Sequence, residues 1–239
     1  MVSKNSFLIF SVLLIIVGSL SLSFALPTGV EITFNQTETP SVTSSSQLTT
    51  AGGSFTTLVL NSTFQNPRWK AYVGNISGVL TLSDSSGSSI YDWGLAAASG
   101  QVYVSRNDTV DWSTISCASE SAILAEESFL NKVSSNVDSI NNTFNNTVHR
   151  GFFIGTTEIV SSTCRSIVTN VNDAGQAISE TSVFQEVLLG DAFNNLVYTA
   201  LLEDSVVGYD GSFYDFQMIV PEDSTSPTPT TYYFYAEIN

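Results

Sequence analysis

The sequence predicts a mainly β protein, an antiparallel β-sandwich with one inserted helix around residues 120–133. Short runs rich in Val, Ile, Phe, Tyr and Thr recur along the chain and are separated by Gly, Ser, Asn and Asp. Turn signals at roughly every 8–12 residues are typical of sandwiches and barrels. One long stretch, "ASESAILAEESFLNKV", contains neither Gly nor Pro and favours a helix. The topology we expect is of the jelly-roll or Ig-like kind.

The first 25 residues have the three parts of a secretory signal peptide. Lys4 supplies the positive charge, residues 7–22 supply the apolar stretch, and Ser23-Phe24-Ala25 is a small-x-small cleavage site. An uncleaved membrane anchor is the competing interpretation, because a span needs roughly 20 apolar residues. A prepilin signal, the third, would have Gly or Ala after the basic residue, which "KNS" lacks. In each case the remaining chain lies outside the cell.

Two regions follow the signal segment. Residues 26–53 predict an extended Ser/Thr-rich arm or edge strand, since β-formers alternate there with small polar residues around Pro40. Residues 54–239 predict a single β-rich extracellular domain, without an internal repeat or a long linker. The runs that predict strands are 54–60, 68–74, 78–84, "SSIYDW", "GQVYVSR", 150–160, "SVFQEVLL", "NLVYTALLE", 214–222 and 231–238.

The predicted helix covers residues 120–133 and has a less regular continuation to Asn145. Apolar residues keep a helical spacing through the whole stretch, at Leu130, Val133, Val137, Ile140, Phe144 and Val148. Asn and Ser dominate between them, and these residues favour caps and turns over helix interiors. The pattern therefore predicts regular helix only in the first part.

Composition excludes some partners. The formal net charge is −15 although charged residues make up only 12% of the chain, so the imbalance comes from scarce Lys and Arg. Such a surface repels phosphate backbones and argues against nucleic-acid binding. We expect self-association or other cell-surface proteins as partners, and membrane contact only through an uncleaved N-terminal segment.

The two cysteines, Cys117 and Cys164, predict a disulfide, because an even pair in an exported chain meets an oxidising environment. The alternative is a thiol nucleophile that works with His149, which requires one cysteine to stay free outside the cell.

No catalytic residue, cofactor or metal site is predicted. His149 is the single histidine, and there is no HExxH, paired CxxC or GxSxG motif. Three interpretations stay open for the aspartates: they form turns, they bind a structural calcium ion, or two of them act as a glycosidase pair. The acid pairs concerned are Asp84 and Asp92, Asp108 and Asp111, and Asp210 and Asp215.

Aromatic residues and sequons complete the candidates. Trp69, Trp93 and Trp112 could form a sugar-stacking platform, but large aromatics in β proteins more often fill the core. Sequons predict N-glycosylation at Asn35, Asn61, Asn75, Asn107, Asn141 and Asn145.

The series "WKAYVGNISGVLTLSD", "SIYDW", "GQVYVSR", "WSTISC", "YDFQMIVPE" and "YYFYAEI" resembles a group of archaeal secreted cell-surface proteins. The resemblance implies an exported, β-rich, N-glycosylated protein of the cell envelope. At the level of the fold, an extended arm ahead of a β-domain is similar to archaeal thread and bundling-pilus subunits. That second similarity implies donation of an N-terminal strand to the next subunit.

We therefore expect a non-enzymatic extracellular structural protein. As a filament subunit it would add residues 27–50 as a strand to a neighbour. The alternatives are a carbohydrate-binding or adhesin module of the cell surface and, third, a secreted glycosidase or protease.

Overall fold

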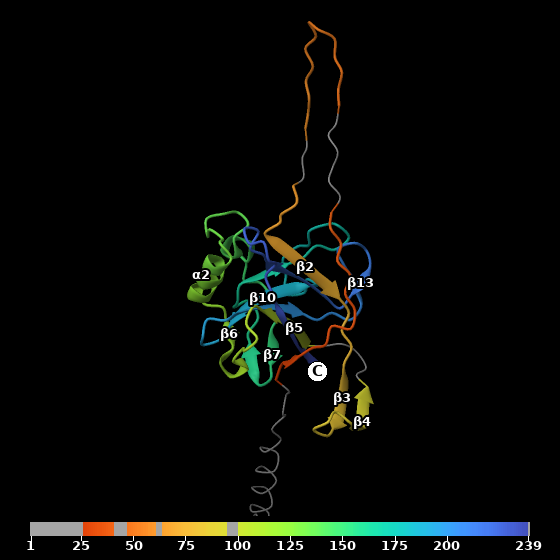
Figure 1. The fold of residues 1–239 in the computed structure, drawn as a ribbon, viewed down its shortest axis with the longest axis vertical. Helices are drawn as coiled ribbons and strands as arrows, with labels where there is room; N and C mark the ends of the chain where they lie inside the picture. Colours follow the sequence, from red (N-terminus) through yellow and green to blue (C-terminus); the bar gives the residue numbers. More distant parts are fainter. Residues whose placement is uncertain (1–25, 41–46, 61–63, 95–99, 239) are drawn as a thin grey trace, which may run out of the picture.

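The computed structural model describes residues 26–40, 47–60, 64–94 and 100–238 (Figure 1). The predicted signal peptide and Asn61 lie outside the described residues. Within those ranges, no helix has the length and apolar character needed to cross a membrane.

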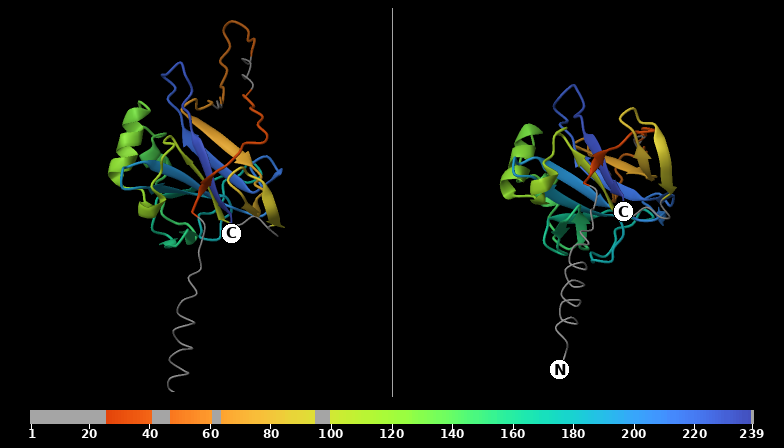
Figure 2. Two further views of the ribbon diagram at one scale, coloured as in Figure 1. Left: turned by 60° about the horizontal axis from the view of Figure 1, so that its bottom comes forward. Right: turned by 90° about the horizontal axis from the view of Figure 1, so that it is seen from below.

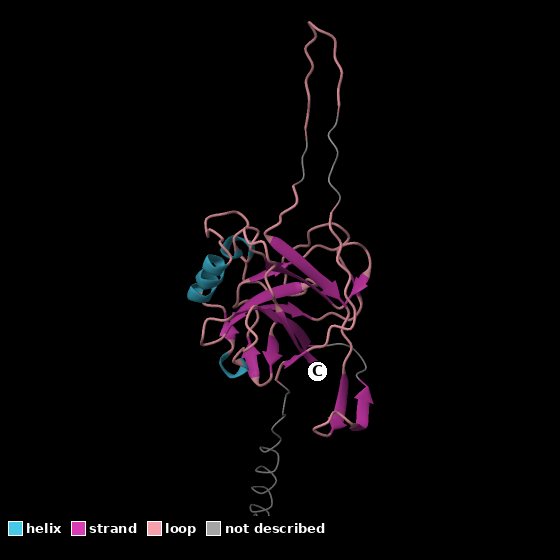
Figure 3. Cartoon of the chain, viewed as in Figure 1, coloured by secondary structure: helices cyan, strands magenta, loops and turns pink. Residues whose placement is uncertain are grey.

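The centre of the domain is an antiparallel sheet, which confirms the predicted fold class (Figure 3). Its strands are, in spatial order, β1 (Thr28–Gly29), β15 (Tyr233–Ile238), β5 (Gly100–Ser105), β11 (Leu196–Leu201), β10 (Gln185–Gly190) and β6 (Ser116–Cys117). The short strand β9 (Ser166–Val168) also pairs with β10, beside β6. Strands distant in sequence are therefore neighbours, as when Tyr235 lies opposite Tyr103.

Both faces of this sheet are covered, which explains why every residue of β10 and β11 is buried. A two-stranded sheet of β2 (Trp69–Gly74) and β14 (Phe216–Pro221) packs on one face together with helix α2 (Glu120–Phe129). The hairpin of β7 (Phe152–Ile154) and β8 (Thr157–Ile159) packs on the other face. Because these layers are small, the arrangement does not confirm the predicted sandwich of two full sheets.

Three small elements complete the described fold. A 3₁₀ turn covers Trp112–Thr114, and β12 (Val206–Val207) pairs with β13 (Phe213–Tyr214). The third is the hairpin of β3 (Val79–Ser83) and β4 (Ser89–Gly94), which follows β2. Neither apolar core cluster includes a residue of this third element.

Helix α2 is shorter than the predicted 120–133. The Ser119 hydroxyl caps its first turn by accepting a hydrogen bond from the Ala122 amide at 3.1 Å. Asn131 adopts a left-handed conformation with φ 51°, which ends the helix after Phe129. A second short helix, α3 (Ile140–Thr143), begins at its own cap, Ser139. The Asn and Ser residues thus act as terminators and caps, as their preferences indicate.

Two strand predictions need correction. The run 150–160 is divided by Gly155, whose φ of 54° turns the chain between β7 and β8. Residues 54–60 are not part of a strand ladder. They belong instead to the projecting arm, because the sequence pattern reports β-propensity and not the presence of a pairing partner.

Candidate assembly interface

A long arm projects from one end of the domain (Figure 1). It leaves the sheet after β1, reaches a tip at residues 51–54, and returns to the start of β2. At the tip the Ser54 amide donates to the Ala51 carbonyl at 3.3 Å, and Gly53 supplies the positive φ of 81° that this turn requires. Both legs lack strand pairing in their described parts.

The arm exposes an unusual number of apolar side chains. Phe55 and Val59 are each 96% exposed and lie two positions either side of Thr57, so an extended chain places them on one face. The other large exposed apolar residues of the arm are Val30, Ile32, Phe34, Leu48, Leu58, Leu60 and Phe64. Exposed apolar side chains gathered on one projecting segment are typical of an interaction site.

The beginning of the arm is already paired within its own chain. Thr28 lies opposite Ala236, Gly29 lies opposite Tyr235, and the Val30 amide donates to the Phe234 carbonyl at 3.3 Å. This two-residue strand covers the outer edge of β15, as short edge strands do in native sheets. The exposed apolar part of the arm is consequently its later portion, which runs beyond the expected donor segment 27–50.

The β3–β4 hairpin lies near the end of the molecule opposite the arm (Figures 1 and 2). Leu82 is paired with Tyr91, and the Tyr91 and Trp93 ring centroids are 4.8 Å apart, so the three side chains share one face. They are 58%, 59% and 46% exposed. At the turn, the Asp84 carboxylate accepts hydrogen bonds from the amides of Ser86 and Ser88 at 2.9 Å each.

The structure joins Cys117 and Cys164 in a disulfide. Buried His149 supports this region, because its Nε2 accepts hydrogen bonds from the amides of Thr163 and Cys164 at 3.2 and 3.0 Å. Its Nδ1 lies 2.8 Å from the Arg150 carbonyl, which fixes the neutral Nδ1–H tautomer. His149 thus holds the loop that carries Thr163 and Cys164. Both cysteines are bonded to each other, so neither is a free thiol nucleophile.

The predicted acid pairs act mainly on local backbone. Asp84 and Asp111 each accept from the hydroxyl and the amide of the serine two residues ahead, and these bonds, the hydroxyl bond first, hold the pKa of each carboxyl below its usual value. The Ser212 amide lowers the pKa of Asp210 in the same way. Asp215 is buried and accepts from the Ile76 and Ser205 amides. Asp92 accepts from the Ser89 hydroxyl, and Asp108 is exposed. Over the described ranges, no group of three His, Cys, Asp or Glu residues could hold a metal ion.

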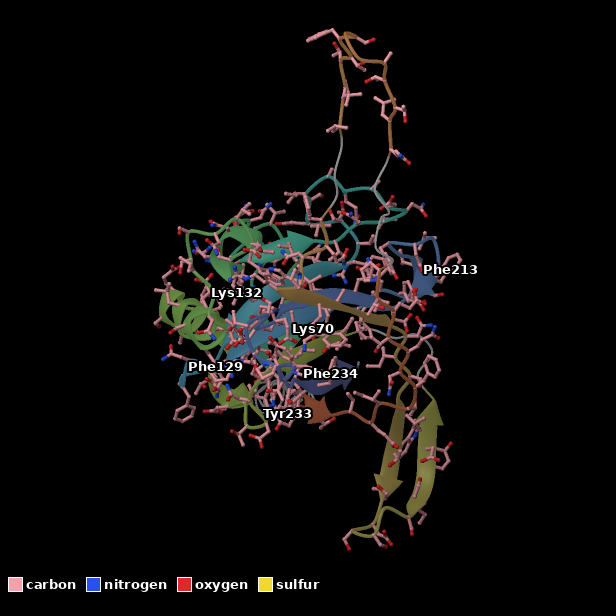
Figure 4. The ribbon with its side chains drawn as sticks, turned by 45° about the horizontal axis from the view of Figure 1, so that its top comes forward. Lys70, Phe129, Lys132, Phe213, Tyr233 and Phe234 are labelled. Atoms are coloured by element: carbon pink, nitrogen blue, oxygen red, sulfur yellow. A yellow bond between two sulfur atoms is a disulfide. The ribbon has the colours of Figure 1, made fainter. Side chains whose placement is uncertain are left out.

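The three tryptophans are separated. Trp69 is the first residue of β2 and packs against the core. Trp112 lies between Tyr103 and Tyr235, tilted to the first ring and edge-on to the second, with centroid distances of 5.0 and 5.3 Å. Only Trp93 is exposed. A different pair of aromatics, Phe129 and Tyr233, lines a surface hollow of about 360 Å³ with Asp223 and the Thr-rich loop 226–231 (Figure 4).

The sequons differ in accessibility. Asn35, Asn75 and Asn145 are exposed. Asn107 is half-buried, and its Nδ2, the atom that would carry a glycan, donates to Asn195 at 2.6 Å. Asn141 is also half-buried, with a buried Oδ1 that has no hydrogen-bond partner. Glycosylation stays a prediction, and the geometry favours the three exposed sites.

Sequence reasoning missed several buried charged residues. Arg106 pairs with Glu126, whose side chain is 5% exposed. Lys132 is buried over Trp69 and donates to the Arg68 carbonyl at 2.8 Å, and burial lowers its pKa to about 8. Glu186 is the second residue of β10 and accepts from the Ile219 amide at 2.9 Å, while its Oε1 has no partner. For Glu186, its place inside the apolar run "SVFQEVLL" is the feature of the sequence that indicates burial.

Burial raises the pKa of Glu186 well above its usual value, which predicts a pH-dependent stability. Below about pH 4.5 the Glu186 carboxyl is protonated in the folded and in the unfolded chain. At higher pH the carboxyl ionises in the unfolded chain but keeps its proton in the folded chain. The free energy of unfolding should therefore fall by about 1.4 kcal/mol per pH unit from this group. Glu186→Gln should remove that contribution to the slope in denaturant titrations from about pH 5 upward.

The matched control is Glu158→Gln, because Glu158 is exposed on β8 and this variant should keep the wild-type slope. Burial also raises the pKa values of Glu126 and Glu237, so part of the wild-type slope should persist in Glu186→Gln. An identical slope in Glu186→Gln and wild type would contradict the prediction.

Comparison with known proteins finds no matching family model, no matching curated protein and no matching solved structure.

Proposed function

We propose that this protein is an extracellular structural subunit that self-associates into filaments by β-strand addition. The observation that carries the proposal is the projecting arm, whose apolar side chains are exposed and whose backbone lacks strand pairing over 47–60. An extended segment of this kind satisfies its backbone groups and covers its side chains when it adds to a sheet edge. The resemblance to archaeal cell-surface proteins agrees with this role.

Charge and covalent structure support the same proposal. The segment 47–60 contains no charged residue, so association through it desolvates no ion. The disulfide suits an oxidising compartment, which is the environment of an exported protein. Export itself, with cleavage after residue 25 and glycosylation, belongs to the proposal.

Carbohydrate binding at the cell surface is the second candidate function. It draws support from the hollow beside Phe129 and Tyr233, where aromatic faces, an acid and hydroxyl groups come together. Specific retention on polysaccharide by a protein that stays monomeric would favour this function over filament assembly.

The double variant Phe55→Ser/Val59→Ser tests the proposed function. Both side chains are exposed in the monomer, so the domain should fold normally, with unchanged circular dichroism and thermal midpoint. In the filament both would be buried, and their loss should raise the critical concentration for assembly by at least about a hundredfold. Sedimentation and electron microscopy of the mature protein would measure this.

The control variant is Val137→Ser, because Val137 is 90% exposed on the loop after α2 and lies outside the arm. It should assemble as wild type does. Filaments formed equally well by the arm variant and the control would refute assembly through the arm.

A further inference from the structure

The β3–β4 hairpin lacks the packing that makes such an element stable. A two-stranded hairpin is marginal in water and needs a third strand or a packed face. Here the outer edges of β3 and β4 have no strand partner among the described residues, and the face of Leu82, Tyr91 and Trp93 is open to solvent. The hairpin is therefore an incomplete sheet.

The chain contains a segment suited to complete it. Residues 54–60 form the returning leg of the arm and present apolar side chains on both faces, with Phe55 and Val59 on one and Leu58 and Leu60 on the other. Added to an edge of the hairpin, Phe55 and Val59 would continue its aromatic face, and aromatic and β-branched cross-strand pairs stabilise sheets. Asp92, the one acid within β4, alternates with Tyr91 and Trp93 and lies on the opposite face.

Within one molecule the two elements lie apart, because the arm and the hairpin project from opposite ends of the domain (Figure 1). A contact between unlike surfaces at opposite ends is heterologous and propagates head to tail. We infer that the arm of one copy adds its residues 54–60 as a strand to the β3–β4 hairpin of the next copy. This inference rests on the proposed function and names its acceptor.

Site-directed cross-linking tests the contact. Both native cysteines are bonded, so an introduced cysteine is the reactive thiol of each variant. Full mature chains carrying Val59→Cys and Tyr91→Cys would be prepared separately, mixed under assembly conditions and oxidised. A disulfide-linked dimer of the two variants is expected, since neighbouring strands bring Cα atoms to roughly 4.5–5.5 Å. Mixing Val59→Cys with Val137→Cys is the control and should give at most about a tenth of that product.

A second measurement uses Tyr91→Ser/Trp93→Ser. Both side chains are exposed, so circular dichroism should show an intact domain, while the critical concentration should rise about tenfold. If the arm variant blocks assembly and this hairpin variant does not, the acceptor is wrong and the proposed function stands. If neither variant affects assembly, the proposed function fails as well. Binding of the monomer to lipid vesicles through the hairpin, without cross-linking, would also overturn the inference.

Discussion

Reduction of the Cys117–Cys164 disulfide should lower the free energy of unfolding by about 4 kcal/mol, because the bond restricts a long loop in the unfolded chain. The two cysteines are 47 positions apart, and the loop between them contains α2, α3 and the β7–β8 hairpin. Cys117 ends β6, and Cys164 stands two residues before β9. The bond therefore joins two short strands that share one edge of β10.

Denaturant titrations of oxidised and reduced wild-type protein would measure this loss with identical side chains in both samples. The Cys117→Ala/Cys164→Ala variant should match the reduced protein apart from the contacts of the lost sulfur atoms. Reduction should accelerate amide hydrogen exchange more in β6 and at the start of α2 than in β5, which lies in the middle of the sheet. Equal stability of the oxidised and reduced forms would refute the entropic account of this bond.

Most strands can be predicted from the sequence, because a strand is marked by its own residues and by the turn residues that flank it. The positions of β2, β4, β5, β10 and β14 follow from β-rich runs between turn residues, and the Asp84 turn follows from the preference of Asp for such sites. The pairing of strands could not be predicted. β2 and β14, for example, are far apart in the sequence, and they pair because both bury side chains in the same core cluster. The same limit explains residues 54–60, which have the propensity of a strand but no strand partner among the residues that the structure describes.

The candidate interface was predicted only in part. An N-terminal arm follows from its composition, but its exposed apolar portion extends past residue 53 because the fold offers no core position for Phe55 or Val59. The general preference of large aromatics for the core does not hold for Trp93, which is exposed on the hairpin. Periodicity reports which side chains share a face and not whether that face is covered. The buried pair of Arg106 and Glu126 depends on the approach of α2 to β5, which no local pattern reports.

Arg106→Met should destabilise the fold by about 3 to 5 kcal/mol, because it leaves the Glu126 carboxylate buried without its cation. Arg106 follows the last residue of β5, and its Nε and Nη2 reach both carboxylate oxygens of Glu126 at 2.8–2.9 Å. The guanidinium carbon also lies 3.5 Å from the centroid of the Phe129 ring. The pair thus attaches α2 to the central sheet.

The double variant Arg106→Met/Glu126→Leu should recover most of that loss, since apolar replacements of a buried ion pair are often neutral or stabilising. Phe129→Leu separates the aromatic contact with Arg106, which should contribute only about 0.5–2 kcal/mol. Arg106→Met, Glu126→Leu and the double variant form, with the wild type, a double-mutant cycle in chemical denaturation.

The deficit of Arg106→Met should also depend on pH. Burial already raises the pKa of Glu126 while Arg106 lowers it, so removing the cation raises the pKa further. Below about pH 4.5 the carboxyl is protonated in the folded and unfolded chains alike, and only lost hydrogen bonds and packing remain. The deficit should therefore be larger at pH 7 than at pH 4. A deficit of the same size at both values would show that Arg106 stabilises the fold through packing, and that the Glu126 charge contributes nothing.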